Sequence, residues 1–360
     1  METNPVQPPA APGAGAAGDR TGTLDEALDR LHVRGPEFVG WLSNHGPMAV
    51  EALVRHGRAD TVHRWLDRYS ERLEEMPEVH TPITPENWFA ALGDPRRIAD
   101  WAVHFERETA ERPWRAVLAE WWPRLLPGIA GGATHPVIRV GHAVRTLLTG
   151  EETAPRVREL AHALGYWAAR HQPLPPVRAL APVRSAAGAL AAVPAVPDQS
   201  AGIGHRLGQL IAFPAWPGGA GTRDIGPDEA HALLRELVTA SVHRYATHGH
   251  GEPVMLVHAA TAPNAVLRTL PALPRELWAA SLSAAWAASA AVTAAYTPAE
   301  GRPYAPEAAV PTPEEVFERA AAHGDDHTIK FTDTALDVGD ARALAAAVRS
   351  IELNAPFLQG

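Results

Sequence analysis

Histidine and lysine side chains are the residues through which this sequence could do chemistry. The chain has 18 histidines, and its 32 basic side chains include a single lysine, Lys330. It has no cysteine, which excludes disulfides, thiolate-bound zinc, iron–sulfur clusters and a cysteine nucleophile. The chemistry open to the chain is therefore metal binding through nitrogen and oxygen ligands, or proton transfer by imidazole.

Two histidines lie where the local backbone holds them in place. His45 precedes Gly46 and Pro47, and because proline suits the first turn of a helix, the imidazole sits just ahead of a helix start. His258 follows residues 254–257, which we expect to be extended, and has small apolar neighbours. A buried neutral imidazole must satisfy both ring nitrogens, and either a metal ion or a backbone carbonyl does this. Each ring is thus a candidate ligand or a structural histidine.

A second pair shares one predicted helix. His135 and His142 are seven residues apart, so they lie on one face about two turns from each other. We take His135 as the candidate ligand and His142 as its alternative.

A di-iron arrangement is the competing pattern. Glu159 and His162 have the i, i+3 spacing of carboxylate-bridged di-iron bundles, and Asp228 with His231 is the best second pair. Such sites need two further carboxylates, so we expect Glu159 to support other residues or to lie at the surface.

The most informative pair is His327 and Lys330, which share one face in the first turns of a predicted helix. The positive end of the helix dipole disfavours a charged amine there, and burial would lower the lysine pKa further. A neutral amine can add carbon dioxide to form a carbamate, which is an anionic oxygen ligand. The competing interpretation is an exposed lysine with no special role.

The elements that position these residues are predicted to be helices. Apolar side chains recur at helical spacing over residues 62–73, 233–242 and 344–351. Capping patterns begin helices at Thr23 with Glu26 and at Thr312 with Glu315; Gly324 should end one helix, and Asp325 or Asp326 should start the next. Alternating strand patterns are scarce, so the fold class is all-α.

A single large domain is expected over residues 23–360, behind a disordered leader at residues 1–22 that is rich in Pro, Ala and Gly. Residues 172–222 are rich in Pro and Gly and could be a domain linker. We favour an irregular crossover within one domain, because candidate residues lie on both sides of it.

Charge and hydropathy limit the partners. A net charge of −9 argues against a nucleic-acid binder. The leader lacks the apolar stretch of a signal peptide, so we expect a cytoplasmic protein. The uncharged run over residues 277–296 is as long as a membrane span, but its alanines, serines and threonine favour a buried helix and no membrane contact.

Five motifs, in this order, resemble those of the questin oxidase-like family. They lie within residues of about 37 to 336 and are Asn44-His45-Gly46-Pro47-Met48, Trp88-x-x-x-Leu92-Gly93-Asp94, Leu126-Pro127-Gly128 leading into His135, Glu159-Leu160-Ala161-x-x-Leu164-x-Tyr166-Trp167-Ala168, and His327-x-Ile329-Lys330. The resemblance implies an oxygen-consuming oxidoreductase that opens the ring of an aromatic polyketide, such as an anthraquinone, in secondary metabolism.

The resemblance also implies a ligand set for a mononuclear non-haem iron(II): His45, His135, His258 and His327 as imidazole ligands and Lys330 as a carbamate. Four imidazoles and one anionic oxygen fill five octahedral positions and leave one for dioxygen or substrate. Because so few positions stay open, we expect the substrate to bind next to the metal rather than on it.

Two other functions remain as alternatives. One is a Baeyer–Villiger-type monooxygenase that uses NADPH, with histidines as acids and bases. Against it, no G-x-G-x-x-G follows a strand, so a Rossmann site for flavin or nicotinamide is not supported. The other is a non-catalytic binding protein for a hydrophobic metabolite. In either case Trp121, Trp122 and Trp167 could line a flat aromatic pocket, although core packing is the commoner role.

Overall fold

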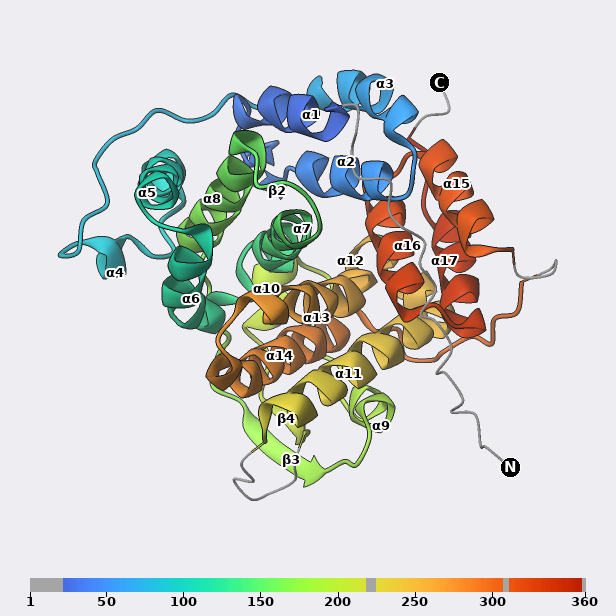
Figure 1. The fold of residues 1–360 in the computed structure, drawn as a ribbon. Coiled ribbons are helices and arrows are strands. Elements are labelled where there is room, and N and C mark those ends of the chain that lie inside the picture. The colour runs from blue at the N-terminus through green and yellow to red at the C-terminus, as the bar shows by residue number, and fades with distance from the viewer. Residues whose placement is uncertain (1–21, 218–224, 307–310, 358–360) are drawn as a thin grey trace, which may run out of the picture.

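The computed structural model describes residues 22–217, 225–306 and 311–357, and these form a multi-helix assembly (Figure 1). The predicted all-α class is confirmed. The helices are α1 (Thr23–His32), α2 (Gly46–Arg55), α3 (Ala59–Ser70), α4 (Trp88–Ala91), α5 (Ile98–Glu111), α6 (Trp114–Leu125), α7 (His135–Thr149), α8 (Ala154–Ala169), α9 (Ala186–Ala191), α10 (Ile203–Leu207), α11 (Pro227–His248), α12 (Pro253–Leu256), α13 (His258–Thr269), α14 (Trp278–Tyr296), α15 (Pro313–His323), α16 (Asp326–Val338) and α17 (Ala341–Leu353). Short 3₁₀ turns join them at Pro95–Arg97, Leu126–Gly128, Gly131–Thr134, Gly249–Gly251, Leu270–Ala272 and Arg275–Leu277.

Two small sheets complete the described part. The strands β1 (Glu37–Phe38) and β2 (Leu42–Ser43) pair antiparallel, whereas β3 (Arg178–Pro182) and β4 (Ala212–Ala215) pair parallel. The second sheet, α9 and α10 all lie in the segment predicted to be irregular, residues 172–222, as far as it is described. The predicted leader lies outside the described residues except for Gly22.

The helix ends predicted from capping residues agree with the structure at some positions and differ from it at others. The helix predicted to start at Thr23 does start there, but the residue in the cap position is Gly22, which has no side chain to cap it. Around α15 and α16 the signals are confirmed: Thr312 and Glu315 form a capping box, Gly324 adopts a left-handed φ of 78°, and the Asp325 carboxylate accepts from the backbone N–H of Thr328.

The prediction that residues 254–257 are extended is wrong. They lie in α12 and at the junction with α13. Pro253 takes the first position of α12, where its missing N–H costs nothing. Their apolar side chains therefore pack on a helical turn that leads directly into His258.

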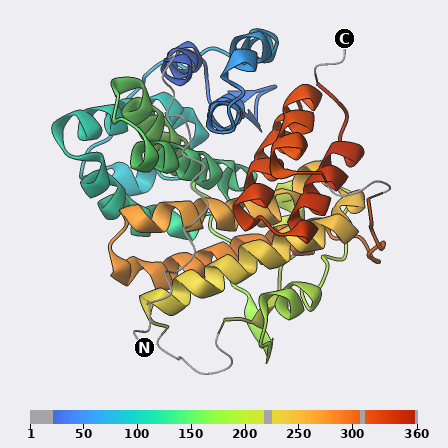
Figure 2. The same cartoon turned by 45° about the vertical axis from the view of Figure 1, so that its right-hand side comes forward.

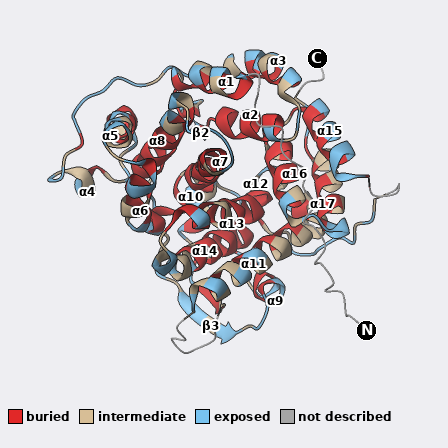
Figure 3. Ribbon diagram, in the orientation of Figure 1, coloured by how far each residue is buried: buried red, intermediate tan, exposed pale blue. Residues whose placement is uncertain are grey.

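Helix α7 lies at the centre of the molecule, surrounded by α2, α8 and α13 (Figures 1 and 3). Nearly all of its side chains are buried, and Gly141 lets α13 approach closely, because a Cβ there would lie 2.5 Å from the Cα of Ala265. In both ribbon views α15, α16 and α17 form one group, and α16 contacts α2 and α13 (Figure 2). The packing thus brings α2, α7, α13 and α16 to one place.

One segment among the described residues, Arg275–Tyr296, is long and apolar enough to cross a membrane by composition. In the structure 61% of its apolar window is buried among other helices, as in a helix of the protein core.

Candidate metal centre

The four histidines predicted as ligands meet at the starts of four helices. His45 is the residue before α2, His135 is the first residue of α7, His258 is the first of α13 and His327 is the second of α16. Each helix directs the positive end of its dipole toward this place, which favours neutral imidazoles and an anion over protonated ones.

His135 and His258 face each other through their Nε2 atoms, which are 2.9 Å apart. The Nδ1 of His135 donates to the carbonyl oxygen of Gly132 at 2.6 Å, and the Nδ1 of His258 donates to that of Met255 at 3.0 Å. A carbonyl only accepts, so the proton of each neutral ring is on Nδ1. Both Nε2 atoms then carry lone pairs, and no proton lies between them.

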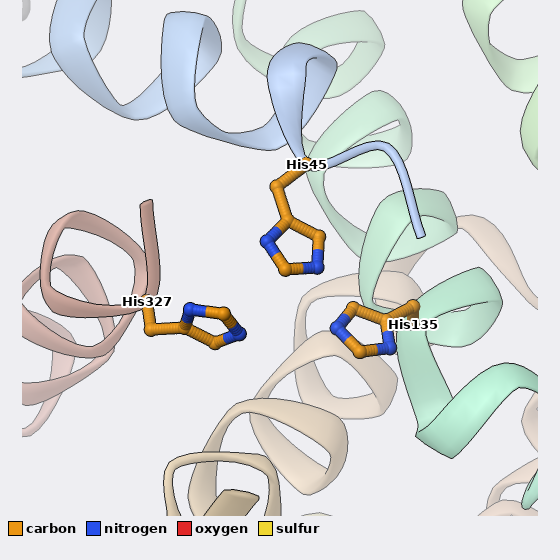
Figure 4. A group of neighbouring side chains, drawn as sticks. All are labelled: His45, His135 and His327. Carbon is orange, nitrogen blue, oxygen red and sulfur yellow. The ribbon is translucent and has the colours of Figure 1, made fainter. Parts of the chain in front are cut away.

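His45 and His327 are oriented by one carboxylate, that of Asp326. Its Oδ1 atom accepts from Nδ1 of His45 at 2.5 Å and lies 2.9 Å from Nδ1 of His327. Figure 4 shows the rings of His45, His135 and His327 arranged around one point, and one ring nitrogen from each lies within 4.8 Å of the others. A carboxylate behind a metal-binding histidine is a recurrent arrangement, because it fixes the ring and its tautomer.

From the sequence Asp326 is expected only at a helix start, whereas in the structure it orients two of the histidines. Its position next to His327 was the available signal. Its bond to His45, 281 residues away along the chain, depends on how α2 and α16 pack.

Lys330 is fully buried one turn after His327, and its Nζ has no hydrogen-bond partner among the described residues. Burial lowers the pKa of this amine to about 8, although Asp326 and Asp325 oppose the shift. The amine in turn lowers the pKa of His45, His135 and His258, which places its charge close to the cluster. A buried amine without a partner is costly, so the structure leaves this group available to a further atom.

The histidines are held neutral by their surroundings, with one exception. Burial lowers the pKa of His45 to about 3 and those of His135 and His258 well below the usual value. For His327 burial acts in the same direction, but the charge of Asp326 and hydrogen bonding to Asp325 and Asp326 outweigh it and raise the pKa. Three imidazoles are therefore unprotonated, as metal ligands must be.

A cavity of about 630 Å³ opens onto the cluster. His45, His135 and His327 form part of its wall. Its aromatic lining comes from Phe38, Trp41 and Tyr296. Cavities of this size and mixed lining hold small organic ligands.

The suggestion that Trp121, Trp122 and Trp167 line a pocket is wrong. All three are buried in the main hydrophobic core. Trp122 and Trp167 pack edge to face at 5.2 Å, and Trp121 packs in the same way on Trp101 at 5.5 Å. These contacts pack α6 against α8 and against α5.

His142, the alternative to His135, belongs to a separate ionic cluster. Its Nδ1 donates to Glu51 at 2.6 Å, and Glu51 also accepts from Arg145. Arg145 continues to Asp333, which pairs with Arg268 as well. We call this cluster the arginine network; its members are Glu51, Arg55, His142, Arg145, Arg268, Asp333 and Asp337. In it three carboxylates face three guanidiniums, so their lone pairs are already used.

The residues of the di-iron alternative are not assembled into a site. Glu159 is buried and accepts from Arg139 at 2.6 and 2.7 Å, whereas His162 bonds Glu106. Asp228 is exposed and pairs with Arg275. The competing pattern therefore lacks the shared centre it requires.

Comparison with known proteins bears on residues 42–184, which match a family model described as questin oxidase-like. The resemblance stated from the motifs is thereby confirmed over this segment. It includes His45 and His135, whereas His258, His327 and Lys330 lie beyond it. A search of curated proteins found no match.

Proposed function

From the premise that residues 42–184 match the questin oxidase-like family, we propose that the protein is an oxidoreductase that consumes dioxygen at a mononuclear non-haem iron centre. The ligands are His45, His135, His258 and His327, with Lys330 as a carbamate. The substrate is an aromatic polyketide of the anthraquinone type, and its ring is opened oxidatively. The observation that carries the proposal is the 2.9 Å approach of the Nε2 atoms of His135 and His258, whose Nδ1 atoms both face backbone carbonyls.

The spacing of these two atoms fits a shared metal ion. Bonds from nitrogen to a first-row ion are about 2.0–2.1 Å long, so two neighbouring ligands at a right angle lie about 3 Å apart. The observed separation is 2.9 Å. Two lone pairs this close repel each other, and a metal ion held by both nitrogens would remove the repulsion. A hydrogen bond cannot do so while both Nδ1 protons are held by carbonyls.

Lys330 supplies the anionic ligand in this proposal. With a pKa near 8, part of the amine is neutral at physiological pH. The neutral nitrogen attacks the carbon of carbon dioxide and a C–N bond forms. The π bond of one C=O breaks, its electron pair moves to that oxygen, and one N–H proton leaves to solvent. The resulting carbamate carries one negative charge, as suits the convergent helix starts and a divalent ion.

The other residues orient the ligands and hold the substrate. Asp326 fixes the rings of His45 and His327, and the carbonyls of Gly132 and Met255 fix the other two. Phe38, Trp41 and Tyr296 line the cavity with aromatic surface against which a planar ring can pack. When bound, iron would supply affinity for dioxygen and reversible electron exchange.

The test is oxygen uptake by anaerobically purified protein loaded with Fe(II), measured with a hydroxylated anthraquinone as probe, with and without NADPH. The proposal expects uptake that needs iron and the probe, needs no NADPH, and is lost in Lys330→Met and His327→Ala. Uptake that needs NADPH and persists without iron would contradict it and favour the monooxygenase alternative. Binding of the probe without any uptake would favour a binding protein.

A further inference from the structure

We propose that the ligand of the cavity carries an anionic oxygen group, a carboxylate or an ionised acidic phenol, and that Arg72 recognises this group. The inference deepens the proposed function and rests on it for the identity of the cavity as the substrate site. It adds a charge requirement and a specificity-determining residue.

Arg72 lies on the cavity wall, two residues after α3. Its guanidinium lies 4.4 Å from the ring centroid of Phe357, 4.6 Å from that of Tyr69 and 5.7 Å from that of Phe38. Three aromatic rings thus hold the guanidinium in place. The structure gives this side chain no hydrogen bond or ion pair with any residue that it describes.

Other arginines stacked on rings differ from Arg72 in this respect. Within the described ranges, five further arginines lie over aromatic rings, and each has an oxygen partner: Arg115 with Glu152, Arg124 with Glu120, Arg275 with Asp228, Arg349 with Glu352, and Arg206 with two backbone carbonyls. Arg72 has the rings without the acceptor. A guanidinium offers five N–H donors in a fixed plane that matches a carboxylate, so an oriented one beside a cavity is suited to an incoming anion.

The remaining charged side chains on the described cavity wall have polar partners of their own. Arg170 pairs with Glu37, with a bond of 2.6 Å from Nε. Asp326 faces His45 and His327, and Asp325 accepts from the backbone of Thr328. Arg72 is therefore the charged side chain of the described wall that has no polar partner, and its donors are open to a ligand.

The position of Arg72 also suits a ligand that reaches the histidine cluster. The hydroxyl of Tyr69, whose ring lies against Arg72, accepts from the backbone N–H of His45 at 2.6 Å. The anion-binding point and the cluster are thus separated by one tyrosine. A three-ring aromatic acid held at Arg72 extends toward the histidines within a cavity of about 630 Å³.

The experiment uses two fluorescent probes of the same shape, anthracene-2-carboxylate and anthracene-2-carboxamide. Their affinities are measured by fluorescence anisotropy at pH 7.5 for the full chain as purified and for Arg72→Gln, Arg72→Lys and the control Arg124→Gln. Arg124 is also stacked on rings, those of Trp88 and Trp121, but lies outside the cavity lining.

We expect the wild type and Arg124→Gln to prefer the carboxylate by roughly ten-fold or more, the range of a charge-assisted hydrogen bond. Arg72→Gln should bind both probes with the affinity that the wild type has for the carboxamide, and Arg72→Lys should keep part of the preference. Equal binding of the two probes by the wild type, or binding of neither, overturns the proposal. So does a loss in Arg72→Gln that is the same for both probes, since Arg72 would then only support the cavity wall.

Repeating the titration with His327→Ala separates this inference from the proposed function. If the carboxylate binds a metal ion instead, its preference survives Arg72→Gln and disappears in His327→Ala, which also overturns the inference. If the protein binds no metal and consumes no oxygen, but Arg72 still sets the preference, the proposed function fails and the inference stands.

Discussion

The histidine cluster and the arginine network are both built from buried polar side chains on the same four helices, yet their groups are matched in opposite ways. Helix α2 contributes Glu51 to the network and its preceding residue His45 to the cluster, and α16 contributes Asp333 to the network and His327 to the cluster. In the network every carboxylate meets a guanidinium. In the cluster, two imidazole nitrogens face each other without a proton and the Lys330 amine has no described partner.

The difference indicates a division of roles along each helix. Buried charges that are paired hold helices in register, and breaking such a pair is costly. Buried polar groups left unmatched cost stability, and native structures keep them where a ligand completes them. We infer that the network fixes the four helices and that their starts are thereby held ready for a metal ion.

Removing one side of the network should have the largest effect on stability. Asp333→Ala leaves Arg145 and Arg268 buried without their shared carboxylate. We expect the free energy of unfolding to fall by about 3–5 kcal/mol. Urea unfolding followed by circular dichroism measures it, and a loss below about 1 kcal/mol would show that the network does not hold the helices.

A second prediction concerns the stability of the protein at low pH, which depends on the buried Glu159–Arg139 pair. Burial alone would raise the pKa of Glu159, but Arg139 and the bond from His32 lower it to about 2. Because the folded pKa is depressed, its contribution is present above the unfolded value near 4.5 and is lost as pH falls through 2. We expect a loss on the order of 3 kcal/mol in this window.

Glu159→Gln should flatten the pH dependence of unfolding between pH 4.5 and 2, whereas Glu314→Gln, at an exposed helix start, should leave it unchanged. An unchanged slope in Glu159→Gln would show that this carboxylate is not matched by arginine as the structure places it.

In the histidine cluster, removing a polar group should leave the free energy of unfolding unchanged or raise it, in contrast to the loss expected in the arginine network. Lys330→Met replaces an unpartnered buried amine by an apolar side chain of similar length. The metal-free protein should unfold with unchanged or higher free energy, by up to about 2 kcal/mol, because an unsatisfied polar group is removed. Chemical unfolding in the presence of a chelator tests this. A loss above 2 kcal/mol would mean that Lys330 is a structural residue.

Local signals in the sequence predicted some parts of this arrangement and could not predict others. The capping box at Thr312 and the helix start at Asp325 follow from hydrogen bonds within a few residues, so they were predictable and are confirmed. Residue type and local context made His45, His135, His258, His327 and Lys330 separate candidates, and the resemblance to the family implied that they form one ligand set. The structure brings the four histidines together.

Features that depend on contacts between distant parts of the chain could not be predicted from the sequence. His135 and His142 are both buried on α7, and spacing alone gives them equal claims. The choice depends on their partners, since His142 meets Glu51 of α2 whereas His135 meets His258 of α13. The role of Asp326 depends in the same way on the packing of α16 against α2.

The most direct test is the metal content of anaerobically purified protein, determined by inductively coupled plasma mass spectrometry for the wild type, His135→Gln, His142→Gln, His327→Ala and Lys330→Met. The matched pair on α7 separates the cluster from the network. We predict close to one iron per chain in the wild type and in His142→Gln, and loss of most of it in the other three. A wild type without a transition metal, or iron that is lost in His142→Gln but kept in His135→Gln, would contradict the account.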